Sequence, residues 1–238
     1  MDVTNGLLNS LAAEERAAVT PHLREHSFKI GDVLYDHGDP VTDVHFIDSG
    51  IISILTMMLD GSSVETAALG NEGMVGDGAI FRSAPFFGRA LVQADGRSAK
   101  IETGRLQELV ARHDGLRNAL ERYSNAQTSE AQQNAACNAV HRLEARLAKW
   151  LLRCHDRVSG DSLPMTQEFL SYMLGAQRTT VTEVARRLQF AGLIRYSRGK
   201  IEIIDRAGLE RASCECYGVV QDRLAELGLQ ASSKRQLA

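Results

Sequence analysis

The sequence gathers its basic side chains in one short stretch. Residues 178–200 hold six lysine and arginine residues and a single acidic residue, Glu183. The net charge of the chain is −3, but residues 1–140 hold 11 basic and 19 acidic residues, whereas residues 141–238 hold 16 and 11. A basic patch on an otherwise acidic chain is typical of a nucleic-acid-binding module attached to another domain. A solvated helix face is the alternative interpretation.

The apolar spacing in this stretch predicts which side chains face outward. Four apolar residues recur with helical spacing and predict one buried face: Val181, Val184, Ala185 and Leu188. The opposite face mixes hydrogen-bonding and cationic groups, which can contact base edges and phosphates. The predicted base-reading residues are Arg178, Thr179, Thr182 and Glu183, and the predicted phosphate-binding residues are Thr180, Arg186, Arg187, Arg198 and Lys200.

The neighbouring elements predict a helix-turn-helix followed by a β-hairpin. We expect a helix from Thr166 to Leu174, a turn at residues 175–177, and a second helix from Arg178 to Ala191 that stops at Gly192. Two short strands are expected on either side of residues 197–199. A further amphipathic helix at residues 141–157 precedes this unit, and a break at residues 159–164 separates the two.

A long helix is predicted between Asp114, as its N-cap, and about Asn138, because this stretch lacks proline and is rich in Ala, Gln, Arg and Glu. One face is apolar and is predicted to pair with a second copy of the chain; it consists of Leu116, Ala119, Leu120, Tyr123 and Ala126. This face turns polar at Gln127, Glu130 and Asn134, so the dimer is expected to need further contacts. The alternative is a helix that packs on its own domain.

The N-terminal half has the pattern of an all-β roll. From Phe28 to about Ile101, short β-rich runs alternate with Gly, Asp and Pro turn signals. We expect Gly31, Gly38 and Gly50 at turns between strands, where a positive φ is needed.

This order of elements resembles the Crp/Fnr family of bacterial regulators. The resemblance is carried by TQEFLSYMLGAQRTTVTEVARRLQFAGLI at residues 166–194, by the following RGKIEI, and by the F-K-x-G and V-x-F-I-x-x-G turns. It implies an α+β fold with an N-terminal double-stranded β-helix (jelly-roll) sensor domain at residues 1–110, a long dimerisation helix at 111–140 and a C-terminal winged helix-turn-helix at 141–238. It also implies a homodimer on double-stranded DNA, with reading helices about 34 Å apart on a two-fold operator. RNA polymerase is the implied further partner if the protein is an activator.

The sensor half departs from the family's cyclic-nucleotide cassette, which uses Gly-Glu for the ribose and Arg-Ser for the cyclic phosphate. Here Gly76 and Asp77 stand at the Gly-Glu position, and Gly88 and Arg89 at the Arg-Ser position. The Asp77 carboxylate is one methylene shorter than that of glutamate. We therefore predict a transcription regulator that is not controlled by cyclic AMP and has no cofactor. A regulator that binds a cyclic nucleotide through Asp77 and Arg89 is the alternative, as is a packed roll without a ligand.

Other functions lack the residues that they need. The first cysteine is Cys137, so the N-terminal cysteine cluster of the family's iron-sulfur sensors is missing. Cys214 and Cys216, if helical, would point their sulfur atoms about 200° apart, which predicts no metal site. The sequence has no H-x-H pair, G-x-S-x-G motif or Walker loop, and we predict that it is not an enzyme.

The sequence also predicts a cytoplasmic protein without membrane partners. No apolar run reaches the roughly 20 residues that span a bilayer, and the first residues lack the pattern of a secretory signal. The remaining alternative is a ligand-binding or protein-interaction module whose helix-turn-helix is only architectural. Salt-dependent binding to duplex DNA would distinguish the two functions.

Overall fold

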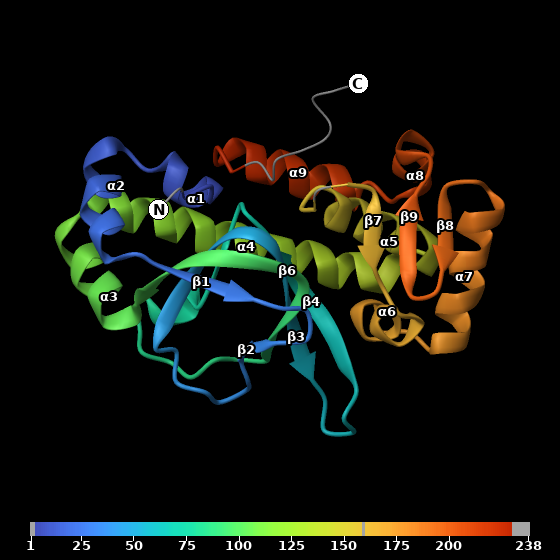
Figure 1. Cartoon of the computed structure of the whole chain (residues 1–238), viewed down its shortest axis with the longest axis horizontal. Helices are drawn as coiled ribbons and strands as arrows, with labels where there is room; N and C mark the ends of the chain where they lie inside the picture. Colours follow the sequence, from blue (N-terminus) through green and yellow to red (C-terminus); the bar gives the residue numbers. More distant parts are fainter. Residues whose placement is uncertain (1–2, 159, 230–238) are drawn as a thin grey trace.

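The computed structural model describes residues 3–158 and 160–229. An antiparallel β-roll forms the N-terminal half, a long helix runs along it, and a smaller unit of helices with a three-stranded sheet follows (Figure 1). This is the predicted α+β architecture. Ser159 of the predicted break and residues 230–238 of the predicted last domain lie outside the described residues. None of the helices in the described part of the chain is long and apolar enough to cross a membrane.

Two long strands organise the β-roll. Its sheet has the order β1-β6-β3-β4, with β2 paired to β6 and β5 paired to β3, and every pair is antiparallel. Helices α1 (Gly6–Ser10) and α2 (Ala13–Val19) and the 3-10 turn η1 (Thr20–His22) precede the roll, and α3 (Thr103–Arg112) follows it. The strands are β1 (Arg24–Phe28), β2 (Val33–Tyr35), β3 (Asp43–Met57), β4 (Ser63–Leu69), β5 (Met74–Val75) and β6 (Arg89–Glu102), with the 3-10 turn η2 (Asp77–Ala79) between the last two.

Gly50 permits a bend in the middle of β3. Gly31 and Gly38 lie in turns with φ of 91° and 90°, as predicted. The prediction of a turn between strands at Gly50 was wrong, because this residue lies inside β3, with φ of 88°, where the β3–β6 register shifts. A Cβ atom at Gly50 would lie 2.7 Å from the Ala94 carbonyl oxygen, so glycine is required for both its φ and its space.

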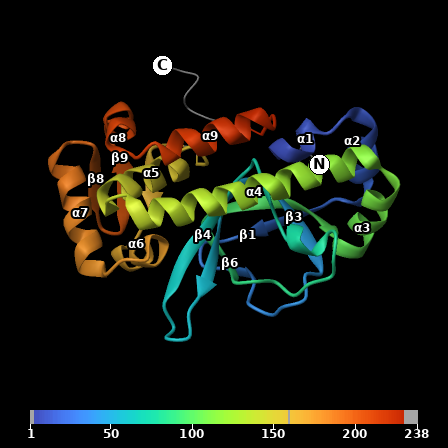
Figure 2. The ribbon, with the colours of Figure 1, turned by 180° about the vertical axis from the view of Figure 1, so that it is seen from behind.

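The long helix α4 (Asp114–Val140) packs along the β-roll (Figure 2). The structure confirms this helix, except that Asp114 is its first residue and His113 its N-cap. Tyr123 of α4 is 1% exposed and fastens the helix to β5: its hydroxyl accepts a hydrogen bond from Met74 N (2.9 Å) and donates one to Met74 O (3.2 Å). Gln127 donates a further hydrogen bond to the same hydroxyl.

The apolar face of α4 is covered by the chain's own β-roll, so its assignment to a dimer seam was wrong. Leu116 and Leu120 are fully buried in one core together with Phe46 and Met74 of the roll and Leu106 of α3. The other members of the predicted seam are also buried within the single chain: Ala119, Tyr123 and Ala126. A period of 3.6 residues shows that a face is apolar but does not reveal what covers it.

The C-terminal unit has the predicted order of helix, turn, helix and hairpin. Its elements are α5 (Leu143–His155), β7 (Ser162–Pro164), α6 (Gln167–Leu174), α7 (Arg178–Phe190), β8 (Ile194–Ser197), β9 (Lys200–Ile203) and α8 (Arg206–Ala212). The Thr166 hydroxyl caps α6 by accepting from Phe169 N (3.1 Å). Gly175 ends α6 in the left-handed conformation, and Gly192 has φ of 75° directly after the α7 C-cap.

The last helix, α9 (Cys216–Glu226), returns from the winged-helix unit along α4. Figures 1 and 2 both show α9 beside the long helix. Val220, Leu224 and Leu229 belong to the same core as Leu116 and Leu120 of α4. The C-terminal helix therefore packs on the sensor half, although it follows the winged-helix unit in sequence.

Candidate nucleic-acid interface, sensor pocket and junction

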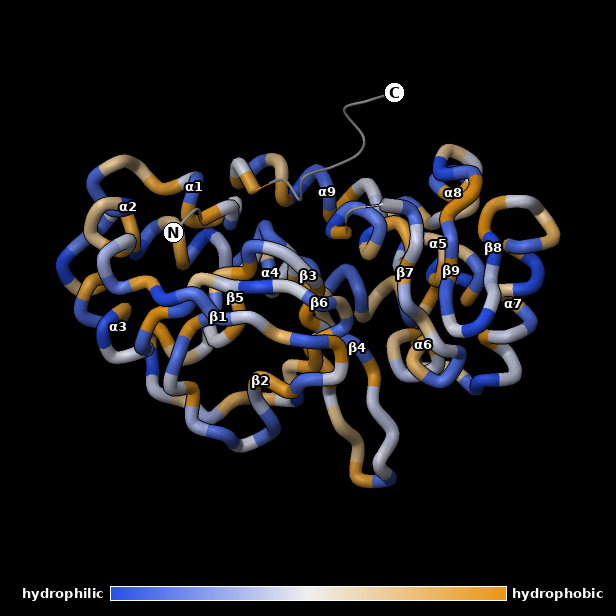
Figure 3. Tube along the Cα trace, in the orientation of Figure 1, coloured by the Kyte–Doolittle hydropathy of each residue, from blue (hydrophilic) through white to orange (hydrophobic). Residues whose placement is uncertain are grey.

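Helix α7 presents a polar face to solvent and an apolar face to its own unit. The four predicted core residues are buried: Val181, Val184, Ala185 and Leu188. Among the predicted DNA-contacting residues of α7, Thr182 is half-buried. The others are exposed: Arg178, Thr179, Thr180, Glu183, Arg186 and Arg187. Figure 3 shows hydrophilic residues along α7 and at the turn between β8 and β9.

Two of the predicted base-reading residues already have partners within α7. Glu183 forms an ion pair with Arg187 (2.5 Å), which also lies 3.8 Å from Glu144. The Thr182 hydroxyl donates to the Arg178 carbonyl oxygen (2.8 Å). Arg178 and Thr179 are thus the predicted base-reading residues with the greatest freedom to contact a ligand at the start of α7.

A basic hollow of about 380 Å³ lies between α6, the start of α7 and the β8–β9 hairpin. Arg178 and Arg198 contribute two guanidinium groups to it, and the backbone N–H groups at the N-terminus of α6 contribute partial positive charge. Arg198 holds a positive φ of 50° in the hairpin turn, and Lys200 follows in β9. The lining also includes residues that the sequence analysis did not single out: Thr166, Gln167, Tyr196, Ser197 and Gly199. Thr166 could have been found, because a threonine directly before an apolar periodic segment is an N-cap signal.

The sensor half contains an apolar pocket of about 340 Å³. Gly76 and Asp77 line it, together with Phe86 and Phe87. The Asp77 carboxylate accepts a hydrogen bond from Ser124 (3.3 Å), but desolvation outweighs this contact and raises its pKa. No lysine or arginine is found among the described residues that line the pocket.

The other two predicted pocket residues are held elsewhere. Arg89 forms two hydrogen bonds with Asp36, from Nε (3.1 Å) and from a terminal nitrogen (2.7 Å). Gly88 N donates to His37 Nδ1 (3.2 Å). The structure thus brings Gly76 and Asp77 together in the pocket, whereas neither Gly88 nor Arg89 is among its lining residues.

Comparison with known proteins accounts for both halves of the chain. Residues 25–113 match the cyclic nucleotide-binding domain model, and residues 145–212 match the Crp-like helix-turn-helix domain model. The CRP-like cAMP-activated global transcriptional regulator of Mycobacterium tuberculosis is 24% identical over 213 residues, which cover 87% of this chain and 95% of that protein. The chain belongs to the Crp/Fnr family of transcription regulators.

Further relatives of this Crp/Fnr regulator match it over most of its length. The transcriptional regulator SdrP of Thermus thermophilus is 26% identical over 194 residues, or 77% of this chain and 91% of that protein. The solved structure of a Crp/Fnr-family transcriptional regulator from Eubacterium rectale has the same fold, with a TM-score of 0.70 at 22% identity over 87% of this chain and 96% of the other.

The described lining of the sensor pocket of this Crp/Fnr regulator has no cationic side chain for a cyclic phosphate. A cyclic phosphate carries a negative charge, and its burial needs a cation or several hydrogen-bond donors. The described lining offers neither arginine nor lysine, and it adds a buried carboxylate at Asp77.

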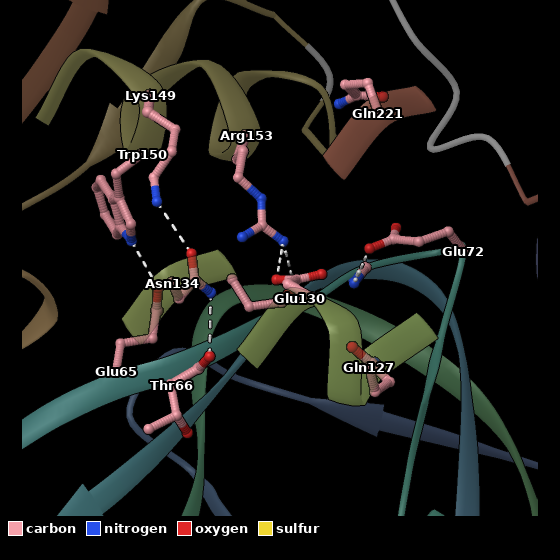
Figure 4. Close-up of polar contacts among 12 residues, drawn as sticks. Glu65, Thr66, Glu72, Gln127, Glu130, Asn134, Lys149, Trp150, Arg153 and Gln221 are labelled. Carbon is pink, nitrogen blue, oxygen red and sulfur yellow. Dashed lines mark hydrogen bonds and ion pairs between the residues drawn. The ribbon is translucent and has the colours of Figure 1, made fainter. Parts of the chain in front are cut away.

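A polar junction joins the winged helix of the Crp/Fnr regulator to its sensor half. Figure 4 shows side chains of α5 pointing toward acceptors on β4 and α4. Trp150 Nε1 donates to Glu65 Oε1 (2.7 Å), and Arg153 pairs with Glu130. The remaining contacts are Lys149 Nζ to Asn134 Oδ1 (2.9 Å), Asn134 Nδ2 to Thr66 O (3.2 Å) and Arg157 Nε to Glu72 Oε1 (2.8 Å). Glu130 and Asn134 interrupt the predicted seam. Both therefore make contacts within the chain.

Two of the three glutamates of the junction, Glu65 and Glu72, have pKa values shifted in opposite directions. Desolvation raises the pKa of Glu65, and hydrogen bonds from Ser53 and Trp150 do not offset it. Glu72 is 3% exposed, so desolvation favours its neutral form as well. The charge and hydrogen bonds of Arg157 outweigh this desolvation and lower the pKa of Glu72. Glu72 is therefore ionised and paired with a buried arginine at neutral pH.

A second cluster lies where α4 ends and α9 begins. The side chains of Cys137, His141, Cys214 and Cys216 each place a ligand-type atom within 4.8 Å of the other three. The expectation that Cys214 and Cys216 point apart on a helix was wrong, because Cys214 lies between α8 and α9 and only Cys216 is helical. Burial opposes ionisation of the Cys137 thiol, but a hydrogen bond with His141 and the charge of Lys149 lower its pKa to about 7.

Proposed function

We propose that this Crp/Fnr regulator binds DNA as a homodimer and reads each half of a two-fold operator with α7. The observation that carries the proposal is the exposed polar face of α7 beside the basic hollow formed with α6 and the hairpin. A side chain at the start of a reading helix can reach base edges while neighbouring cations hold the phosphates. A merely architectural helix-turn-helix has no need for this arrangement.

Each predicted contact has a defined chemical role in this proposal. Arg178 donates two hydrogen bonds to guanine, and Thr179 and Thr182 contact a thymine methyl group or a base edge. Glu183 accepts a hydrogen bond from cytosine after Arg187 leaves its ion pair with Glu183 and contacts a phosphate instead. The remaining phosphate contacts come from Thr180, Arg186, Arg198 and Lys200.

The homodimer is proposed to form through the face of α4 that its own chain leaves exposed. Seven exposed residues follow alternating steps of three and four along this helix: Asn118, Glu121, Asn125, Thr128, Gln132, Ala135 and Ala139. This spacing is that of a coiled-coil seam, and its small C-terminal residues allow two helices to approach closely. The boundaries of the sensor domain (1–110), the dimerisation helix (111–140) and the DNA-binding domain (141–238) remain part of the proposal, as does RNA polymerase as the partner of an activator.

Binding to the operator is proposed not to require cyclic AMP, because the described pocket lining has no cation for the phosphate. The test is selection of duplexes from a random library by the purified protein, with and without cyclic AMP and at two salt concentrations. We expect a two-fold motif in both ligand conditions, and weaker binding at higher salt because phosphate contacts release counterions.

A matched control is Arg211→Ala, which removes an exposed arginine on α8, outside the proposed interface. This variant should select the same motif as the unaltered protein. If no motif is enriched in any condition, the DNA-reading proposal fails. A motif that appears only with cyclic AMP would instead favour a regulator that responds to the cyclic nucleotide.

A further inference from the structure

The spacing of the four side chains between α4 and α9 matches a tetrahedral metal site. Zinc lies about 2.3 Å from a cysteine sulfur and about 2.0 Å from a histidine nitrogen, so two sulfurs on one ion are about 3.8 Å apart and a sulfur and a nitrogen about 3.5 Å apart. In the structure Cys137 Sγ lies 3.6 Å from Cys214 Sγ, and Cys216 Sγ lies 3.5 Å from His141 Nδ1. The side chains therefore need only small adjustments to share one ion.

The orientation of His141 is also that of a metal ligand. Its Nδ1 faces the sulfur atoms, whereas its Nε2 lies 3.1 Å from the Glu215 carboxylate. A histidine that binds a metal through one ring nitrogen usually donates the other N–H to a carboxylate, which fixes the ring and its tautomer. Glu215 lies between Cys214 and Cys216, so the same short segment supplies two ligands and this supporting contact.

Hydrogen-bond donors surround the sulfur atoms. Lys149 Nζ lies 3.3 Å from Cys137 Sγ, and Gln133 Nε2 lies 2.9 Å from Cys216 Sγ. Three thiolates and one Zn²⁺ carry a net charge of −1, which the Lys149 ammonium group offsets. The three cysteines form a small buried cluster of their own, packed with Ala145.

We propose that Cys137, His141, Cys214 and Cys216 bind one Zn²⁺ ion. All four positions of the tetrahedron are protein ligands, which is the arrangement of a structural rather than a catalytic zinc site. The ion connects the C-terminal end of α4 to the segment between α8 and α9, and so holds α9 against α4. Because His141 is the C-cap of α4, the ion also fixes the chain where α4 passes into α5.

The test measures metal binding by the full-length protein, purified with a reductant and stripped with a chelator. We expect one equivalent of Zn²⁺ to be retained after gel filtration. Titration with Co²⁺ should produce the thiolate charge-transfer band and the strong visible absorption of a tetrahedral site, saturating at one equivalent. Cys137→Ser, Cys214→Ser, Cys216→Ser and His141→Ala should each weaken Co²⁺ binding at least tenfold. The control Cys154→Ala removes a buried thiol from a different core and should bind as the unaltered protein does.

A measurement on the unaltered chain guards against variants that fail to fold. Alkylation followed by mass mapping should show Zn²⁺ slowing the reaction of Cys137, Cys214 and Cys216, whereas the rate for Cys154, which is equally buried but belongs to a different core, should not depend on Zn²⁺. The proposal is overturned if Zn²⁺ protects none of the three thiols, or if Co²⁺ gives no tetrahedral spectrum. It is also overturned if the reduced protein binds no metal and mild oxidation simply joins Cys137 to Cys214 in a disulfide.

Discussion

Arg178 and Lys200 are both exposed cations of the proposed DNA interface, but they should affect binding in different ways. Arg178 starts α7, where it can contact a base edge, so Arg178→Ala should cost about 1 to 3 kcal/mol on the selected operator and relax the preference at one base pair. Lys200 starts β9 and suits a phosphate, so Lys200→Ala should weaken binding to all sequences alike and lower the salt slope by about 1.

Fluorescence anisotropy with the operator and its single-base variants, over a salt series, measures both effects. Equal loss on every duplex for Arg178→Ala would remove this residue from the base-reading set. Arg211→Ala again serves as the exposed control.

The sequence predicted which single residues are buried where neighbours along the chain define the buried face. The buried face of α7 followed from the positions of Val181 and Leu188 within one helix. The cysteine cluster did not follow, because Cys137 and Cys214 are 77 residues apart and meet only when α9 folds back onto α4. The partner of Arg89 was missed for a similar reason, since Asp36 lies 53 residues away.

At the scale of elements, the two glycines that end α6 and α7 provide a matched comparison. Both have a positive φ, but a Cβ at Gly175 would lie 3.0 Å from Val64 Cγ2 in β4, whereas one at Gly192 would meet nothing within 4 Å. Gly192→Ala should therefore cost about 1 kcal/mol for its conformation alone. Gly175→Ala should cost more, because the Val64 side chain must also give way by a few tenths of an ångström. Urea denaturation of both variants measures the difference, and equal losses would show that the contact with β4 adds nothing.

The exposed stripe of α4 makes a second prediction for an element. Ala135→Glu places two like charges next to each other across the proposed seam, which should weaken the dimer at least tenfold, or about 1.4 kcal/mol. Sedimentation velocity over a concentration series measures the dissociation constant. Ala17→Glu, on the exposed side of α2, is the control and should leave the dimer unchanged. If the dimer tolerates Ala135→Glu, the seam lies on another surface.

Existence and type of the elements were predictable, but their partners were not. The long helix was located to within about two residues of its end, yet its apolar face was assigned to a second copy of the chain. The same ambiguity affected Gly50, whose turn-like pattern belongs to a bulge inside a long strand. In both cases contacts between distant segments decided the outcome.

Across the whole molecule, the junction should make stability depend on pH in two opposing ways. Because the pKa of Glu72 is lowered, the contribution of Glu72 to folding stability is complete at pH values above the ordinary pKa of 4.5. It is lost as the pH falls toward the lowered pKa. Glu72→Gln leaves the charge of Arg157 buried, so it should cost about 3 to 5 kcal/mol at pH 7, with a smaller difference below pH 4.5.

Glu65→Gln is the matched control and should have the opposite sign. Because the pKa of Glu65 is raised, the contribution of Glu65 to folding stability is complete below pH 4.5. It is lost as the pH rises through the raised pKa. Removing its charge while keeping an acceptor for Trp150 should therefore leave stability at pH 7 unchanged or increased. Urea midpoints between pH 4 and pH 8 test both variants, and a loss of similar size for the two would contradict this account.

The two hydrogen bonds between the Tyr123 hydroxyl and the backbone of Met74 also limit how a signal can travel through the molecule. Moving α4 along its axis by a single residue is a 1.5 Å step, which would break both bonds in a buried environment. Sliding of the helix along its axis therefore costs the free energy of both hydrogen bonds, whereas a tilt about Tyr123 can keep them. We expect a change in the β-roll to reach the far end of α4 as such a tilt, so that a small movement at the pocket becomes a larger sideways displacement at the winged helix.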